Sequence, residues 1–465
     1  MKINMPRDVR LIIEKLIEAG YEAYAVGGCV RDSLIGREPH DWDITTSATP
    51  YEIKDIFKKT IDTGLKHGTV TVMMNHVGYE VTTFRIDGEY SDHRRPDSVT
   101  FTRELREDLL RRDFTINAMA YNDKTGVVDL YGGMDDLRDK VIRCVGNPDE
   151  RFDEDALRIF RAVRFSAQLG YSIEAATADA IKRHVEELRM VSAERIETEF
   201  TKLITSDHPE KIEELYDYGI TSVFLPEFDV LMRTEQETPY HIYDVGHHTI
   251  EVMKNVSPRK HMRYAALLHD IGKPAAKTTE VLDREVHGKY YHNVDHFKGH
   301  NVIGADMVPD IMKRLRMDND TMKAVSRLVY FHDVGINGFS KKGMRRLLSK
   351  LGTENFEDLY ELRIADMKGQ SDFKLEERKQ LIREFREYYE EIVKDRDALS
   401  IKDLMIDGTG LMNMGVPKGP EVGKILNALL EKVLENPSLN EKEELERLAL
   451  EMINSGKREV HDVTI

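Results

Sequence analysis

The stretch Gly27-Gly28-Cys29-Val30-Arg31-Asp32, followed by Asp41-Trp42-Asp43, carries the strongest fold signal in this chain. On a strand, residues two apart point to the same side, so Asp41 and Asp43 are expected to hold the same divalent cations. A glycine pair lets backbone N–H groups approach an anionic triphosphate without an intervening side chain. Each motif alone is more often a turn or a solvated surface. Together they predict phosphoryl transfer with Mg²⁺, which prefers carboxylate oxygens.

Further motifs follow in the next 120 residues. The segment Tyr79-Glu80-Val81-Thr82-Thr83-Phe84 is typical of a strand, and its glutamate adds a third carboxylate. The segment from Arg111 to Ala118 is expected to start a helix, and Arg151 to Phe165 to form another. In that helix Asp155 and Arg158 would share a face and offer acceptors beside a fork of donors, which complements an edge of cytosine or adenine. An ordinary ion pair between helix neighbours is the alternative.

In order and spacing these segments resemble the class II tRNA nucleotidyltransferases, the family of CCA-adding enzymes and bacterial poly(A) polymerases, over most of residues 20–230. The resemblance implies that Asp41 and Asp43 bind Mg²⁺ and that Glu80 completes the catalytic acids. It also implies that the glycine stretch binds the triphosphate, that the Arg112-Asp113 segment senses the ribose, and that the helical Glu-Asp-x-x-Arg motif reads the base. The nucleotide-binding residues expected on this ground are Gly27, Gly28, Arg31, Asp32, Arg112, Asp113, Asn117, Glu154, Asp155, Arg158, Arg161 and Arg164.

A second set of motifs lies beyond residue 240. Its order resembles the HD phosphohydrolase domain, which implies a primary metal site and the position of a second metal. The residues implied are His248, His269, Asp270 and Asp366 for the first metal, and His300 and His332 for the second. Imidazole with carboxylate suits Mn²⁺, Ni²⁺, Fe²⁺ or Zn²⁺. His292 and His296 have helical spacing from His300, but only His300 matches the pattern, so the other two are expected to be exposed.

Composition limits the class of protein. The 465 residues, 40% hydrophobic, predict about three domains, and no apolar run approaches the roughly 20 residues of a membrane span. The first residues lack a secretory apolar region, and two cysteines indicate neither a disulfide framework nor a cysteine zinc site, so a cytoplasmic enzyme is expected. The net charge of −16 argues against a dedicated nucleic-acid-binding domain. RNA contacts are therefore expected from local patches, namely Arg94-Arg95, Arg111-Arg112, the Arg158/Arg161/Arg164 face and Lys341-Lys342 with Arg345-Arg346.

The expected fold class is α+β, with a small mixed-sheet nucleotidyltransferase head over residues 1–145. Helices are predicted at 9–19 and 50–58, and strands at 22–26, 42–45, 69–74 and 80–85. After residue 146 nearly everything is expected to be helix, with Ser192 capping one. The predicted parts are a neck and body over 146–235, an HD domain over 236–370 and a tail over 371–465. By resemblance, residues 87–102 form the loop used to switch from C to A addition, and the segment around Pro420 belongs to a tail that contacts the tRNA elbow.

The resulting hypothesis is template-independent addition of CCA to the 3′ end of tRNA from CTP and ATP, with contacts to the acceptor stem and the elbow. A poly(A) polymerase or an enzyme that adds only A remains the second interpretation. A metal-dependent phosphohydrolase acting on RNA ends is the third.

Overall fold

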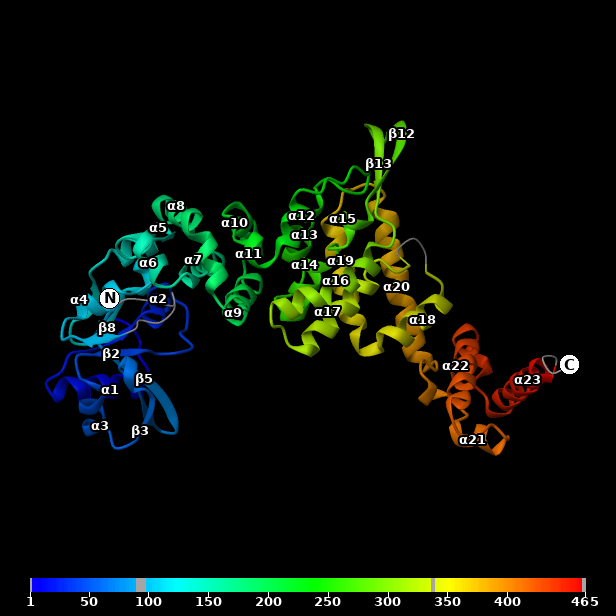
Figure 1. Cartoon of the computed structure of the whole chain (residues 1–465), viewed down its shortest axis with the longest axis horizontal. Helices are drawn as coiled ribbons and strands as arrows, with labels where there is room; N and C mark the ends of the chain where they lie inside the picture. Colours follow the sequence, from blue (N-terminus) through cyan, green and yellow to red (C-terminus); the bar gives the residue numbers. More distant parts are fainter. Residues whose placement is uncertain (1, 89–97, 336–338, 462–465) are drawn as a thin grey trace. The chain divides into compact units, whose positions relative to one another are not determined.

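The computed structural model describes residues 2–88, 98–335 and 339–461. The chain divides into two units, one comprising Met1–Val230, Pro258–Lys260 and Asp310–Asp318, and the other the remaining residues. A mixed sheet near the N-terminus followed by a mostly helical chain confirms the α+β class (Figure 1). The boundaries of the four predicted domains stay predictions.

The head is built on a seven-stranded sheet with the order β3-β4-β5-β2-β1-β8-β9. The pair β2·β5 is parallel and the other pairs are antiparallel. The strands are β1 (Ala23–Val26), β2 (Ile44–Thr46), β3 (Thr60–Gly64), β4 (Thr69–Met74), β5 (Val77–Thr83), β8 (Met119–Asn122) and β9 (Gly126–Asp129). The helices of the head are α1 (Arg7–Glu18), α2 (Gly28–Leu34), α3 (Pro50–Ile56), α4 (Leu105–Leu110) and α5 (Gly133–Asp139).

Local sequence accounts for several of these elements. Helix α1 buries apolar residues at helical spacing, and the chain leaves it through Gly20 at a φ of +90°. Helix α3 starts with a capping box between Thr49 and Glu52, with Pro50 at its first position. Strand β2 begins at Ile44, so the expectation that Asp41 and Asp43 lie on the strand is wrong, and both precede it.

The helix expected to begin near Arg111 is also wrong. Helix α4 ends before Arg111, and a 3₁₀ turn, η2 (Thr115–Asn117), leads into β8. Extended backbone at Phe114 pairs with Cys144, so tertiary pairing overrides local propensity. Cys29 and Cys144 are both buried free thiols.

The predicted neck follows the head. Its helices are α6 (Pro148–Glu154), α7 (Leu157–Leu169), α8 (Ala175–His184), α9 (Ala193–Ile204), α10 (Ile212–Asp217) and α11 (Thr221–Phe224), all in the first unit, and α12 (Pro226–Met232), which begins in the first unit and ends in the second. Edge-to-face contacts among Phe160, Phe200 and Phe224, with ring centroids 4.9–6.2 Å apart, pack its interior. A short parallel pair, β10 (Val141–Ile142) with β11 (Ser172–Ile173), interrupts the helices. Ser192 precedes α9 as predicted, but its side chain makes no capping hydrogen bond.

Asp155 separates α6 from α7. Its backbone is extended, with φ −145° and ψ 102°, so one helix does not carry both Asp155 and Arg158. The prediction that these side chains share a helical face is therefore wrong. Any joint action on a base depends on the geometry of this break.

The second unit is largely helical. Its main helices are α13 (Val245–Asn255), α14 (Lys260–Leu268), α15 (Lys273–Ala276), α16 (His300–Arg314), α17 (Asn319–Phe331), α18 (Lys341–Leu351), α19 (Phe356–Lys368), α20 (Leu375–Asp395), α21 (Gly408–Asn413), α22 (Pro420–Glu435) and α23 (Lys442–His461). The first residue of α14 and the end of α16 from Asp310 belong to the first unit. Leu411, Leu429, Val433 and Leu445 are among the residues of a separate apolar core under the last three helices.

The expectation of continuous helix fails at the hairpin of β12 (Thr278–Val286) and β13 (Lys289–His296), which projects from this unit (Figure 1). His292 and His296 therefore lie on a strand, and both are exposed as expected.

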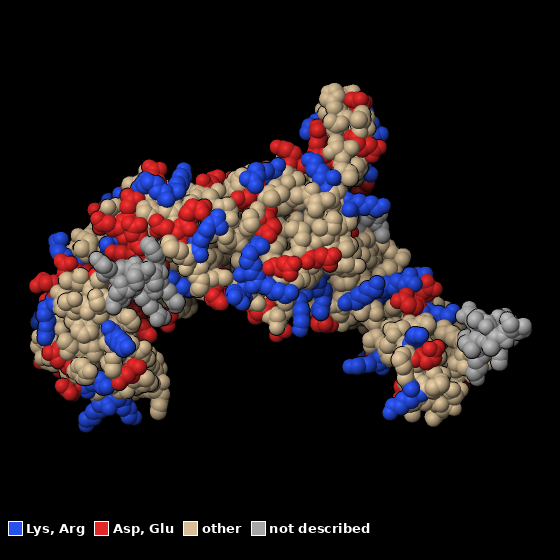
Figure 2. All heavy atoms as spheres, in the orientation of Figure 1, with Lys and Arg blue, Asp and Glu red and all other residues tan. Residues whose placement is uncertain are grey.

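Acidic and basic side chains are interspersed over the visible face (Figure 2). The predicted patch around Lys341 is neutralised, because each of its four cations pairs with a carboxylate. Arg94, Arg95 and most of the predicted loop lie outside the described residues, while β6 (Arg85–Asp87) and β7 (Val99–Phe101) pair at its base. Among the described residues, no helix combines the length and apolarity needed to cross a membrane.

Candidate functional site

The glycine stretch lies beside the Asp41–Asp43 segment. Gly27 has a φ of +81° and follows β1 directly, and its N–H donates to the carbonyl of Met119 at 3.2 Å. The N–H of the preceding residue, Val26, donates to the carbonyl of Asp43 at 3.0 Å. A Cβ at Gly27 would lie 3.0 Å from Nη1 of Arg112, so both the backbone conformation and the close approach favour glycine. These contacts bring three predicted site segments together.

The candidate catalytic acids are accessible. Asp41 and Asp43 are exposed directly before β2. Extending the parallel register of Ile44 with Val81 by one residue places Asp43 level with Glu80, which is exposed on β5. Partial desolvation raises the pKa of Asp43, Arg112 opposes this shift, and Asp41 adds to it. In residues 2–88, 98–335 and 339–461, some His, Asp and Glu side chains form groups of three whose possible metal-ligand atoms all lie within 4.8 Å of one another. Asp41, Asp43 and Glu80 belong to none of these groups.

A continuous hydrogen-bonded chain links five predicted nucleotide-binding residues. Arg31 donates to Asp32 at 2.9 Å and to Oδ1 of Asn117 at 2.7 Å. Asn117 donates to Asp113 at 3.0 Å, and Nε of Arg161 donates to the other oxygen of Asp113 at 3.0 Å. Burial would raise the pKa of Asp113, but the Arg161 charge and these hydrogen bonds outweigh burial and lower it. The chain joins α2, η2 and α7 around an ionised carboxylate.

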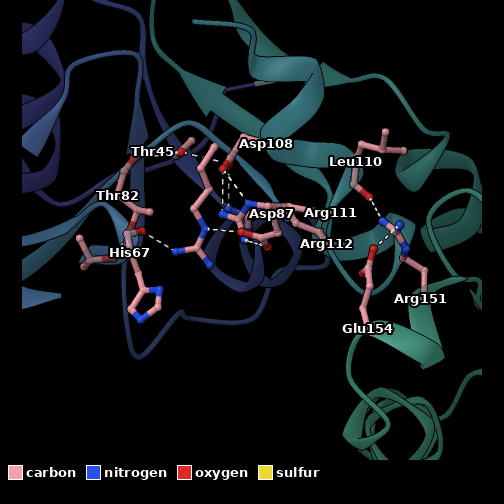
Figure 3. A network of polar contacts seen from close by, with 12 residues as sticks. Thr45, His67, Thr82, Asp87, Asp108, Leu110, Arg111, Arg112, Arg151 and Glu154 are labelled. Atoms are coloured by element: carbon pink, nitrogen blue, oxygen red, sulfur yellow. Dashed lines mark hydrogen bonds and ion pairs between the residues drawn. The ribbon is translucent and has the colours of Figure 1, made fainter. Parts of the chain in front are cut away.

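The predicted base-reading residue Arg158 binds the end of α4. Its Nη2 donates to the carbonyl of Arg111 at 2.8 Å, and Nη1 of Arg151 donates to the carbonyl of Leu110 at 2.6 Å. Glu154 pairs with both Arg151 and Arg158 (Figure 3 shows Glu154 with Arg151). The last carbonyls of a helix have no donors within the helix, so these arginines cap α4 from the neck.

Two other predicted residues have separate partners. Asp155 accepts from Arg195 at 2.7 Å, so it is not paired with Arg158. Arg164 is 6% exposed and donates to Glu199 and Gln168, each at 2.7 Å. Burial lowers the pKa of Arg164 to about 10, although Glu199 opposes the shift. The structure places Arg164 in the packing between α7 and α9.

Asp108 is a buried part of this region that sequence reasoning missed. Its carboxylate is 0% exposed and accepts from Arg111 at 2.8 and 3.1 Å and from Arg112 at 3.4 Å (Figure 3). The hydroxyl of Thr45, two residues after Asp43, lies 3.1 Å from the same carboxylate and 3.2 Å from the carbonyl of Thr82. Burial favours a raised pKa for Asp108, but the two arginines outweigh it and lower the pKa. The available signal was an acidic residue three and four positions before two arginines.

All six residues of the predicted HD set come together in the second unit. Asp270 is central, with Oδ2 3.1 Å from Nε2 of His269 and Oδ1 3.3 Å from Nε2 of His300. Asp366 lies 3.0 Å from Nε2 of His248, and Nε2 of His300 lies 3.0 Å from Nε2 of His332. All six side chains are buried. Their ligand atoms form two groups, one of His248, His269 and Asp366 and the other of Asp270, His300 and His332.

The outer ring nitrogens of these histidines are held by the backbone. Nδ1 of His269, His300 and His332 lies 2.7–2.8 Å from the carbonyl three residues earlier, and Nδ1 of His248 lies 3.2 Å from the carbonyl of Gly369. Donation to a carbonyl directs each Nε2 inward as an acceptor, which is the arrangement that metal-binding histidines require. The donor set of each group therefore fits a transition-metal ion.

Lys273 and His241 were missed at this cluster. Lys273 donates to Asp270 at 2.8 Å and to Gln236 at 3.0 Å, and the signal for it was its position three residues after Asp270. His241 packs edge-to-face on His248, but no spacing in the sequence connects His241 to the rest of the cluster. Both line a cleft of about 630 Å³ that opens onto the cluster.

Three family models match the chain. The Poly A polymerase head domain matches residues 23–143, the probable RNA- and SrmB-binding site of polymerase A matches 170–232, and tRNA nucleotidyltransferase domain 2 matches 302–449. None of these models describes the histidine cluster as an HD domain.

Curated relatives and solved structures are also similar. A CCA-adding enzyme of Lactobacillus johnsonii is 35% identical over 449 residues, covering 94% of this chain and 96% of that protein. One of Ligilactobacillus salivarius is 53% identical over 207 residues, 44% of this chain and 51% of that protein, so this match spans about half of that relative. The structure of the Bacillus stearothermophilus CCA-adding enzyme in complex with CTP has a TM-score of 0.69 at 27% identity, and covers 98% of this chain and 100% of that one.

Proposed function

Because the chain belongs to the family of CCA-adding enzymes, we propose that it adds CCA to the 3′ end of tRNA from CTP and ATP without a nucleic-acid template. The proposal is supported by the convergence of the glycine stretch, the Asp41–Asp43 segment and the Arg31–Asn117–Asp113–Arg161 chain in one head. A solved CCA-adding enzyme with CTP shares the fold at 27% identity. We place this reaction in the cytoplasm, in keeping with two buried free thiols.

Different residues of the head are proposed to bind the triphosphate and the Mg²⁺. Gly27 and Gly28 let the triphosphate approach the backbone at the start of α2, and Arg112 lies against Gly27 as the nearest cation. Asp41 and Asp43, with Glu80 level with Asp43, are the acids that would hold Mg²⁺. Mg²⁺ bound there supplies activation of the primer 3′-hydroxyl and neutralisation of the pyrophosphate.

Base choice is assigned to the break between α6 and α7. Arg158 is 12% exposed and offers a fork of donors, and Asp155, three residues earlier, offers acceptors. To contact a base, Arg158 exchanges its bond to Glu154, and Asp155 exchanges its bond to Arg195. Cytosine and adenine each present an amine donor beside a ring-nitrogen acceptor, which this pair complements.

Incubation of the purified protein with tRNA that lacks CCA, together with CTP and ATP, followed by sequencing of the 3′ ends, tests the proposal. CCA termini support it. Long A tails or a single A would instead support the second interpretation, and unchanged ends would refute nucleotidyl transfer. The relatives named as CCA-adding enzymes favour the first result.

We also propose that the histidine cluster is a metal-dependent phosphohydrolase site. The observation that carries this is the two adjacent ligand groups, one of which contains Asp270, with Nδ1 of all four histidines beside a backbone carbonyl. Mn²⁺, Ni²⁺, Fe²⁺ or Zn²⁺ would supply polarisation of a water for attack on a phosphoester. The proposed substrates are 2′,3′-cyclic or other phosphates on RNA ends, whose removal leaves the 3′-hydroxyl that the head uses. Hydrolysis of a 2′,3′-cyclic nucleotide with each metal in turn tests this, and inactivity with all four would refute it.

A further inference from the structure

We propose that Asp108 is a positioning residue for nucleotide binding, which it serves by holding Arg112 against the glycine stretch. The inference rests on the proposed function, because it concerns the nucleotide that the head binds. Asp108 does not touch that nucleotide, since its side chain is 0% exposed. Any effect on catalysis has to pass through its partners.

The first step in this argument is the charge of Asp108. A fully buried carboxylate is costly unless it is paired, and here Arg111 and Arg112 lower its pKa so that it stays ionised. Arg111 takes one carboxylate oxygen, while Arg112 and the Thr45 hydroxyl lie at the other. Asp108 therefore fixes the two arginines relative to β2, the strand that directly follows Asp43.

The second step is the free end of Arg112. Nη2 faces Asp108 at 3.4 Å, whereas Nη1 lies 3.0 Å from the Cβ position at Gly27. Nε of Arg112 is buried and has no hydrogen-bond partner among the described residues. The guanidinium thus uses only part of its donor capacity within the protein and is directed towards the backbone that cradles the triphosphate.

The third step separates this role from general support of the fold. Arg111 forms the shorter contact with Asp108 and also lies 3.7 Å from Asp87, so Arg111 carries most of the structural pairing. Arg112 gains a weaker contact at 3.4 Å, which is suited to orienting a side chain that must still bind a ligand. Loss of the Asp108 charge should therefore lower stability through Arg111 and nucleotide affinity through Arg112.

A double-mutant cycle tests the coupling. The equilibrium dissociation constant of CTP with Mg²⁺ is measured without tRNA for the full chain, for Asp108→Asn, for Arg112→Ala and for both changes together. We expect each single change to raise the constant by about tenfold or more, roughly the loss of one charge-assisted hydrogen bond, and the double variant to match Arg112→Ala. The inference would be overturned if Asp108→Asn weakened CTP binding by the same factor in the wild-type protein and in the Arg112→Ala variant.

Asp229→Asn is the matched control. Asp229 is also a buried carboxylate that accepts from a threonine hydroxyl, that of Thr221, and it has no role assigned in the nucleotide site. It is expected to lower the melting temperature without changing the CTP constant. If Asp108→Asn fails to fold, Thr45→Val is the second variant. It removes the hydroxyl that lies at the same Asp108 oxygen as Arg112, and it leaves the charge of Asp108 in place. This variant is then expected to raise the CTP dissociation constant two- to threefold when Arg112 is present, and to leave it unchanged when Arg112→Ala is also present. A rise that persists with Arg112→Ala, or no rise in either background, overturns the proposal.

The proposed function has its own readout. Wild-type protein that leaves tRNA unextended refutes CCA addition, while the CTP cycle still reports whether Asp108 acts through Arg112. Wild-type protein that completes CCA, combined with additive effects of the two changes, refutes the positioning role alone.

Discussion

Asp113→Asn is expected to destabilise the first unit by roughly the value of a broken buried ion pair. Asp113 is 8% exposed, and one of its oxygens accepts two N–H groups of Arg161, at 2.5 and 3.0 Å. Asparagine removes the charge and can turn an amide donor towards those two donors. Among the described residues, Glu199, at 3.8 Å, is the carboxylate partner that Arg161 would keep. The cost should be about 3 kcal/mol, at the low end for a buried pair because Arg161 is 32% exposed.

Differential scanning calorimetry at pH 7 measures this change. For a unit of this size, about 3 kcal/mol corresponds to a fall in melting temperature of roughly 6–12 °C. The control is Asp135→Asn, which removes a similar pair with Arg138 at 2.8 Å on the surface, and its melting temperature should stay within about 2 °C of wild type. A decrease in melting temperature of less than 2 °C for Asp113→Asn would refute the view that this carboxylate holds the site together.

The pH dependence gives a second check. The pKa of Asp113 is lower in the folded chain than its usual 3.8, so its stabilisation is fully present above the unfolded pKa and is lost as pH falls through the folded one. The difference between wild type and Asp113→Asn should therefore be constant from about pH 8 to pH 5 and shrink only below about pH 4. A difference that already vanishes between pH 8 and pH 6 would mean that another group carries the effect.

Three further outcomes are expected. Asp43→Ala should abolish nucleotide addition in a primer-extension assay while changing the melting temperature little, because the side chain is exposed, and full activity would contradict its catalytic role. Arg158→Ala should reduce the preference for CTP and ATP over UTP and GTP by about tenfold or more through the loss of charged donors, and unaltered misincorporation would count against base reading. His269→Ala combined with Asp270→Ala should keep CCA addition but lose Mn²⁺-stimulated hydrolysis of 2′,3′-cyclic nucleotides, and hydrolysis that survives would place that activity elsewhere.

The fold was predictable where local periodicity coincides with burial. Helix α1 buries residues at helical spacing and ends near Gly20, and β4 spans the predicted residues 69–74. The resemblance to an HD domain implied six metal-binding residues, and their ligand atoms lie together in two groups of three. Their roles, and those of the acids in the head, stay predictions until activity is measured.

The misses have physical reasons. Spacing of four residues, as between His292 and His296, satisfies both a helical period and the two-residue period of a strand. The hairpin that carries them is mostly exposed on both faces, so no alternation of apolar and polar residues marks it. The break at Asp155 interrupts an acidic and basic segment whose composition favours helix, and its extended backbone accompanies tertiary bonds to Arg195. For Asp108 the local spacing to Arg111 and Arg112 indicates only ion pairs, whereas its burial depends on a contact with Thr45, 63 positions away.

The arginine caps on α4 limit how relatives could exchange parts. The carbonyls of Leu110 and Arg111 receive donors from Arg151 and Arg158, which lie beyond the head-domain match that ends at residue 143. If the head alone were moved into a relative, the two carbonyls would come from this chain and the arginines that cap them would come from the relative. Recombination or engineering should therefore succeed more often when the crossover falls after residue 230, so that cap and capped helix travel as one inherited block.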